Sequence, residues 1–201
     1  MRGSFAVQAT RVAAFVAVLC CQAPMAARAQ QVDVRSISFG IGGGSSAPLG
    51  DARQSYKTGF NGSAFLRIDL GNRPLSLRGD FVYQNFELRR AAIPAAAAPG
   101  GGTGTLLGGL GDLQLYLRGG NVRPYLLAGA GAWSVRTEYD SDALPTRTET
   151  RFGVRGGAGV LLTFGSLLLY AEGAVDQIVP REGAPVSSTI RIAPVTVGVI
   201  F

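Results

Sequence analysis

Eight segments of the chain carry side chains that alternate between apolar and polar residues. A period of two is the pattern of a β-strand with two different faces. Most of the segments are about 10 to 14 residues long, whereas strands in soluble proteins average about five or six. A tilted strand needs about 9–11 residues to cross a lipid bilayer. The segments are Ser36–Gly42, Gly59–Leu70, Leu75–Leu88, Thr105–Arg118, Val122–Thr137, Arg151–Phe164, Leu167–Ile178 and Thr189–Phe201.

The connections between these segments alternate in length. Tight turns rich in Gly and Asn follow the second, fourth and sixth segments, at Gly71–Pro74, Gly119–Asn121 and Gly165–Ser166. The other connections are longer and rich in Ala, Gly, Pro and Ser, which is typical of surface loops. In an antiparallel sheet this arrangement puts every tight turn at one end and every long loop at the other. It is the arrangement of an up-and-down barrel.

Two kinds of barrel fit the alternation, and they differ in which face points inward. A soluble barrel buries its apolar face, whereas a membrane barrel turns that face to lipid and its polar face to the lumen. The polar face here carries arginines and carboxylates in near balance, and the chain's lysine, Lys57, lies in a loop. Paired charges suit an enclosed space, where an unpaired charge is costly. We therefore predict an all-β fold: an eight-stranded antiparallel up-and-down transmembrane β-barrel.

The predicted lumen contains a network of charges. An eight-stranded barrel is just wide enough for its own side chains to fill it, so these charges are expected to plug the interior. The strand glycines are expected to make room for the arginines. The predicted lumen network is Arg67, Asp69, Arg78, Asp80, Asp112, Arg118, Arg151, Arg155, Glu172, Asp176 and Arg191.

Aromatic residues near both ends of the strands predict two girdles at the membrane interfaces. Phe60, Tyr83, Trp133 and Phe152 fall near the long loops, and Tyr125, Phe164 and Phe201 near the tight turns. The apolar positions shift by one residue across Pro194, and proline lacks a donor for the ladder. A β-bulge is therefore expected at Pro194.

The N-terminus has the layout of a secretory signal peptide. Arg2 and Arg11 precede the short apolar run Val12–Cys21, and Ala27–Ala29 has the form of a cleavage site. Residues 1–29 are therefore expected to be removed, leaving an outer-membrane barrel domain over residues 30–201. Removal takes away three arginines and both cysteines, so the formal charge falls from +6 to +3. So small a charge gives no reason to expect a nucleic-acid partner.

The residue types needed for catalysis are scarce. The chain has no histidine, the residue that most often acts as a general base, and its two cysteines lie in the expected signal peptide. We expect no catalytic residue, no metal site and no cofactor, and therefore no enzyme.

Two stretches carry a resemblance to a known family. They are RPYLLAGAGAW, Arg123 to Trp133, and the terminal TVGVIF, which contains Val197, Val199 and Phe201. With the eight-segment plan, the chain over residues 30–201 resembles the small eight-stranded outer-membrane barrels of the OmpA/OmpX kind. The resemblance implies location in the cell outer membrane, with outer-membrane lipid and lipopolysaccharide as neighbours. It also implies transit with periplasmic chaperones, and recognition of Val197, Val199 and Phe201 by the outer-membrane assembly machinery.

Three functions remain open from the sequence. The first is a monomeric, non-enzymatic outer-membrane barrel with a charge-plugged interior, acting in envelope structure or in binding through its loops. The second is the same barrel with a narrow porin-like channel for ions or small solutes. The third is a soluble periplasmic ligand-binding barrel with its apolar residues inside.

Overall fold

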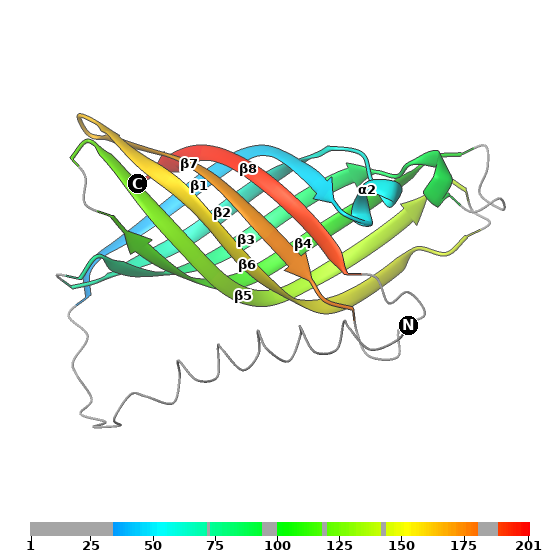
Figure 1. The fold of residues 1–201 in the computed structure, drawn as a ribbon, viewed down its shortest axis with the longest axis horizontal. Coiled ribbons are helices and arrows are strands. Elements are labelled where there is room, and N and C mark those ends of the chain that lie inside the picture. Colours follow the sequence, from blue (N-terminus) through cyan, green and yellow to red (C-terminus); the bar gives the residue numbers. More distant parts are fainter. Residues whose placement is uncertain (1–33, 72, 94–99, 118–119, 142–143, 181–188) are drawn as a thin grey trace, which may run out of the picture. The chain divides into compact units, whose positions relative to one another are not determined.

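A computed structural model describes residues 34–71, 73–93, 100–117, 120–141, 144–180 and 189–201. Eight antiparallel strands pair in sequence order and close into a barrel (Figure 1). This confirms the predicted fold class. The expected signal peptide and its cleavage site lie outside the described residues. The strands are β1 Val34–Leu49, β2 Gly59–Leu70, β3 Leu75–Glu87, β4 Gly102–Tyr116, β5 Val122–Tyr139, β6 Arg147–Phe164, β7 Leu167–Ile178 and β8 Ile190–Ile200.

The tight turns and the longer connections lie at opposite ends of the barrel, as the connection lengths predict (Figure 1). Gly71 and Gly165 adopt positive φ angles of 61° in the turns after β2 and β6. Glycine takes such angles without the steric penalty of a side chain. The other end carries the short helix α2, Ala52–Ser55, and the 3-10 helix η1, Arg90–Ala92. No helix in the described part of the chain is long and apolar enough to cross a membrane.

Strand β1 is longer than the sequence predicts. Residues Gly43–Leu49 were expected in a loop, but all of them pair with β8 and the first four also pair with β2. These residues are mostly small and do not alternate, so their side chains give no strand signal. Hydrogen bonding to two neighbouring strands holds them in the sheet instead.

The prediction of a β-bulge at Pro194 is wrong. Ser46 faces Pro194 and Ala47 faces Ala193 with no shift in register. The register with β7 is likewise the same on both sides of the proline, at Gly173 opposite Val195 and at Asp176 opposite Ile192. Proline removes one backbone donor from the ladder, and no extra residue is inserted. The apolar positions shift because Ile190 and Ile192 point into the barrel, where both are buried.

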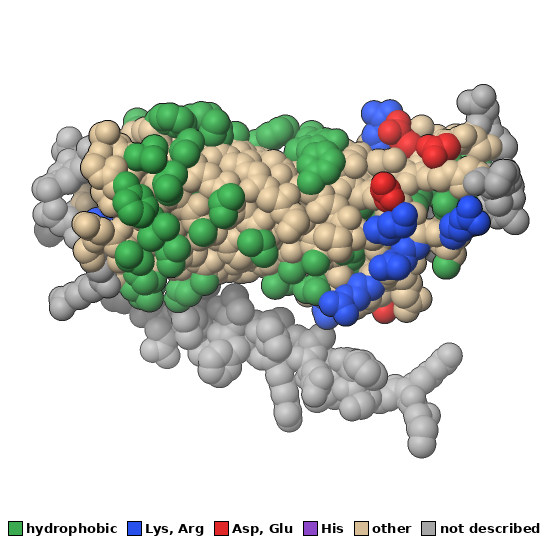
Figure 2. Space-filling view, turned by 90° about the horizontal axis from the view of Figure 1, so that it is seen from above, with side chains coloured by type: hydrophobic (Ala, Val, Ile, Leu, Met, Phe, Trp, Pro, Cys, Tyr) green, Lys and Arg blue, Asp and Glu red, His purple; other side chains and the backbone are tan. Residues whose placement is uncertain are grey.

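The outer surface of the barrel is apolar. Side chains such as Ile37, Phe81 and Leu126 are half or more exposed, and they alternate with buried residues along their strands. Figure 2 shows hydrophobic side chains over the barrel wall and lysine and arginine side chains gathered at the end that carries α2. Val197 and Val199 lie on this outer face, followed by the exposed Phe201. Their recognition by assembly machinery stays a prediction.

Candidate functional site

Arg78 lies at the centre of the lumen and connects two strands across it. Its Nε and Nη2 atoms donate to the two carboxylate oxygens of Asp80, each at 2.7 Å. Its Nη1 and Nη2 atoms donate to Glu172 on β7 at 2.7 and 3.1 Å. The Tyr125 hydroxyl donates to the same glutamate at 2.8 Å. Fork-shaped contacts of this kind are among the strongest hydrogen bonds in proteins.

Arg155 holds a second set of carboxylates beside the first. Its Nε and Nη2 atoms donate to Asp176 at 2.7 and 3.2 Å, and Gln84 donates to that aspartate at 2.9 Å. Arg155 Nη1 also lies 3.8 Å from Asp80 and 3.7 Å from Asp112. Four buried carboxylates therefore surround two buried guanidinium groups in the middle of the barrel.

The other predicted network residues lie farther along the barrel or outside it. Arg67 pairs with Asp69 near the tight turns, with Nε and Oδ1 3.2 Å apart. Arg151 donates to Glu149 at 2.8 Å toward the long loops. Arg118 falls outside the described residues.

The placement of Arg191 in the lumen is wrong. Arg191 is exposed and points outward, between two isoleucines that point inward. The strand alternation forces this arrangement, because successive side chains on a strand take opposite faces.

The predicted aromatic girdle is wrong at two positions. Phe60, Tyr83, Phe152, Phe164 and Phe201 are on the outer surface or at its edge. Tyr125 and Trp133, by contrast, are 1% and 0% exposed inside the barrel. The indole ring of Trp133 fits inside because Gly108 and Gly153 on the two neighbouring strands present no side chain, so an added Cβ would come within 2.8 Å of it.

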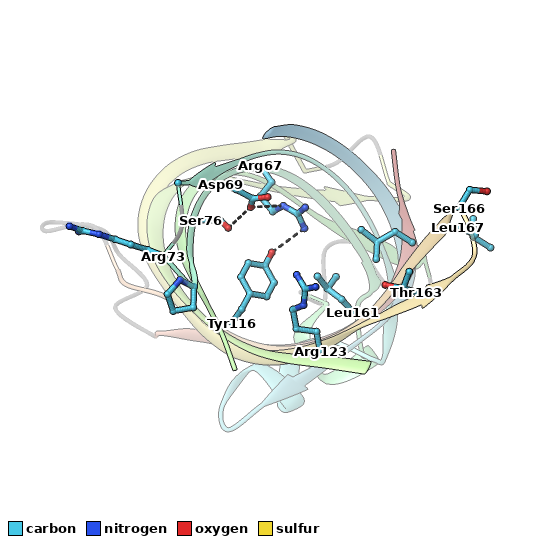
Figure 3. Close-up of a pocket in the computed structure, with 13 residues that line it drawn as sticks. Arg67, Asp69, Arg73, Ser76, Tyr116, Arg123, Leu161, Thr163, Ser166 and Leu167 are labelled. Carbon is cyan, nitrogen blue, oxygen red and sulfur yellow. Dashed lines mark hydrogen bonds and ion pairs between the residues drawn. The ribbon is translucent and has the colours of Figure 1, made fainter. Parts of the chain in front are cut away.

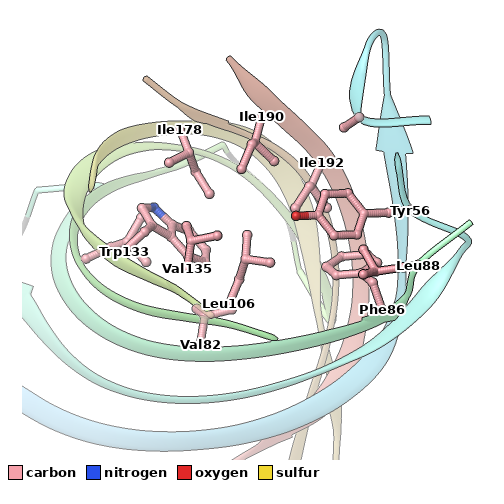
Figure 4. Close-up of a cluster of buried hydrophobic side chains, with 12 residues drawn as sticks. Tyr56, Val82, Phe86, Leu88, Leu106, Trp133, Val135, Ile178, Ile190 and Ile192 are labelled. Carbon is pink, nitrogen blue, oxygen red and sulfur yellow. The ribbon is translucent and has the colours of Figure 1, made fainter. Parts of the chain in front are cut away.

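An apolar cluster, which we call the apolar cap, fills the loop end of the lumen (Figure 4). The sequence analysis missed it, since it assigned a polar lumen to the whole barrel. Inward-facing apolar residues at the loop ends of β3, β4, β5, β7 and β8 were the available signal. The buried members are Ala52, Tyr56, Val82, Phe86, Leu88, Leu106, Leu110, Trp133, Val135, Ile178, Ile190 and Ile192.

The opposite end of the lumen opens into a cavity of about 360 Å³, which we call the turn-end vestibule (Figure 3). Arg67, Asp69, Tyr116 and Arg123 line it together with Thr163. Arg67 donates to the Tyr116 hydroxyl at 3.0 Å and to Ser38 at 3.1 Å. The vestibule is therefore the polar, open end of a lumen that is filled in its centre and at its other end.

The loop end carries a basic surface, which we call the α2–η1 patch. A bridge between Tyr56 and Leu88 and a backbone bond from Arg89 to Ser55 hold the two short helices together. The exposed basic residues of the patch are Arg53, Lys57, Arg89 and Arg90, and its acids are Asp51 and Glu87. Lys57 and Glu87 form an ion pair at 2.8 Å, so the three arginines outnumber the one remaining acid, Asp51, and leave an excess positive charge.

Among the described residues, no group of three or more histidine, cysteine or acidic side chains has an arrangement that could hold a metal ion.

Comparison with known proteins finds a matching family model and solved structures with a similar fold. Residues 13–168 match the model of the outer membrane protein beta-barrel domain family. No curated protein sequence matches. Among solved structures, Neisserial surface protein A aligns with a TM-score of 0.57 at 14% identity, covering 82% of this chain and 94% of that chain. Ail, the attachment invasion locus protein of Yersinia pestis, was solved with the heparin analogue sucrose octasulfate. It aligns with a TM-score of 0.52 at 14% identity, covering 82% of this chain and 97% of that chain.

Proposed function

The chain belongs to the outer membrane protein beta-barrel domain family, and from this we propose that it is a non-enzymatic barrel with a closed lumen that binds anionic polymers at its extracellular end. Membership places the protein in the outer membrane and overturns the alternative of a soluble periplasmic barrel, whose outer face would have to be polar. The long loops of such barrels are extracellular and the tight turns periplasmic. The α2–η1 patch is then on the cell surface.

The filled lumen is the observation that supports this proposal. Arg78 connects β3 to β7 across the centre, with both carboxylate partners buried. Beyond it the apolar cap closes the extracellular half around a fully buried Trp133. Moving an ion through would require breaking buried charge pairs and displacing packed apolar side chains, and both are costly. Function is then left to the two ends of the barrel.

The α2–η1 patch is the part of the extracellular end with a defined chemistry. Arg53 lies on α2, Arg90 on η1 and Arg89 directly before η1, and backbone contacts hold the two short helices together. Arginine recognises sulfate and phosphate groups through its fork of donors. The related barrel Ail was solved with a heparin analogue, and heparin therefore serves as a probe of this class of polymer.

Planar-bilayer recording tests the closed lumen. We expect no stable unitary currents from the wild-type protein or from the surface control Arg191→Ala. The double variant Trp133→Ala/Arg78→Ala removes part of the apolar cap and the central charge pairs, and we expect it to conduct ions. Its currents serve as the positive control, because they show that the protein inserts into the bilayer. Stable currents from the wild-type barrel, altered by Arg155→Ala, would establish the narrow channel instead.

Binding of fluorescent heparin to intact cells that display the protein tests the patch. Arg89→Gln/Arg90→Gln should reduce binding by about tenfold or more, because each lost charge-assisted contact weakens association. Arg73→Gln/Arg123→Gln removes the same charge at the periplasmic end and should have no effect. Equal loss in both double variants would show that net charge, and not the patch, determines binding.

A further inference from the structure

The turn-end vestibule has an exposed cationic side chain that no described residue of the lumen neutralises. Arg123 occupies an inward-facing position of β5, two residues before the buried Tyr125. Figure 3 shows its guanidinium group between Tyr116 and Leu161, directed into the vestibule. It has no hydrogen bond or ion pair with any residue in the part of the chain that the structure describes.

Two neighbouring charges of the vestibule, those of Arg67 and Asp69, are matched to each other. Arg67 is 7% exposed and places Nε 3.2 Å from Asp69, while its other nitrogens donate to Tyr116 and Ser38. Asp69 also accepts a hydrogen bond from Ser76 at 2.5 Å. This carboxylate is therefore committed to Arg67, and the positive charge of Arg123 remains uncompensated in the vestibule.

Hydroxyl groups add donors around the same space. Tyr116 places its hydroxyl group, which accepts from Arg67, in the wall of the vestibule. Thr163, on β6, lines the vestibule with another hydroxyl. Arg123 contributes a planar fork of hydrogen-bond donors. The Arg123 side chain is exposed at the mouth of the vestibule, so an anion can reach its donors directly from solvent.

We propose that the turn-end vestibule binds a small oxyanion, a carboxylate or phosphate group, which Arg123 holds with the Tyr116 and Thr163 hydroxyls. Arg67 forms the fixed floor of this site and sets the position of Tyr116. The tight turns face the periplasm, so the ligand comes from that compartment. A cavity of about 360 Å³ accommodates one such group together with the small part of a molecule that carries it.

Calorimetric titration of the detergent-solubilised full chain tests this site. Sodium phosphate and sodium acetate are titrated separately, in a buffer with neither anion. We expect saturable binding of at least one, weakened about tenfold or more in Arg123→Gln. Tyr116→Phe, which removes only the hydroxyl, should also weaken binding. Arg191→Gln is the matched control, since Arg191 is exposed on the outer face of β8 and does not line the vestibule.

The relative affinities for the two anions distinguish the chemical class of the ligand. Tighter binding of phosphate supports a phosphate-bearing ligand, and tighter binding of acetate a carboxylate-bearing one. Absence of binding by both anions overturns the proposal. So does binding that Arg123→Gln leaves unchanged, or that Arg191→Gln weakens equally. The shift in gel mobility between unheated and boiled samples shows separately that each variant is folded.

Discussion

Arg78 shows how one residue can fix the geometry of the barrel interior. Its guanidinium group makes four hydrogen bonds to two carboxylates, and its Cζ atom lies 4.3 Å from the centre of the Phe65 ring. Bringing these charges out of water is costly, and only their mutual contacts compensate. Removing one partner therefore leaves charge buried without compensation.

The variant Arg78→Met should destabilise the folded barrel by about 3–5 kcal/mol, because Asp80 and Glu172 would lose their shared counter-charge. Urea unfolding of the protein in detergent micelles, followed by far-ultraviolet circular dichroism, measures the change. Glu172→Gln in the same chain should restore part of the lost stability by removing one uncompensated charge.

The exposed ion pair between Lys57 and Glu87 provides the control for Arg78→Met. Both partners are more than half exposed, so water screens the charges. Lys57→Met should barely shift the unfolding transition. If Arg78→Met unfolds at the same urea concentration as Lys57→Met, the central network has no role in stability.

At the scale of the strands, glycines of one strand provide space for the inward-facing aromatic rings of the next. Gly108 and Gly153 lie beside Trp133, and Gly159 lies beside Tyr125. The sequence analysis expected these glycines to make room for arginines, whereas the rings occupy the space here. An aromatic ring that covers a strand glycine recovers packing that the glycine itself cannot supply.

Two adjacent glycines of β4 test this arrangement. Gly108 faces the lumen, where an added Cβ would lie 2.8 Å from the Trp133 ring, whereas Gly109 faces outward with no atom within 4 Å of an added Cβ. Gly108→Ala should cost about 1–3 kcal/mol through overpacking. Gly109→Ala should be neutral or stabilising by up to about 1 kcal/mol, since alanine restricts the unfolded chain. Urea unfolding compares the two variants, and equal effects would contradict the packing of Trp133 against Gly108.

How far the sequence predicts the strands depends on how cleanly each one alternates. Strands β2 and β7 alternate well, and their predicted bounds agree with the structure at both ends. Strand β1 is rich in small residues, and the predicted segment ends seven residues too early. Trp133 was assigned to the wrong face because Gly129 and Gly131 interrupt the pattern of β5. The alternation of a strand shows which residues point inward only where the residues on both faces have side chains.

Closure of the barrel depends on the pairing of the first strand with the last, and we call this pairing of β1 with β8 the seam. Phe39 and Phe201 exchange backbone hydrogen bonds of 3.1 and 2.8 Å across it. The Asn61 side chain on β2 reaches over β1 to this seam, where it donates to the Val195 carbonyl at 3.3 Å and accepts from Thr196 at 2.9 Å. Closing the seam removes the unpaired edges that a lipid bilayer cannot tolerate.

Cysteine cross-linking tests the register of this seam on both sides of Pro194. In a chain without Cys20 and Cys21, the pairs Ile41→Cys/Val199→Cys and Ala47→Cys/Ala193→Cys should both oxidise readily, since each pair is directly opposed. Comparison of oxidised and reduced samples by gel electrophoresis measures the yield. A bulge at Pro194 would move the second pair out of register, so cross-linking of the first pair alone would contradict the continuous strand.

The intrinsic fluorescence of Trp133 can also report on folding of the barrel. It is the only tryptophan in the chain, and in the apolar cap it lies with Leu106, Ile178 and Ile192, from three other strands. Its emission therefore responds to the joining of β4, β5, β7 and β8, and not to the formation of any single hairpin. In a refolding experiment, tryptophan emission would therefore follow closure of the extracellular half, whereas circular dichroism would follow strand formation. Comparison of the two signals would separate the two events in time without an added label.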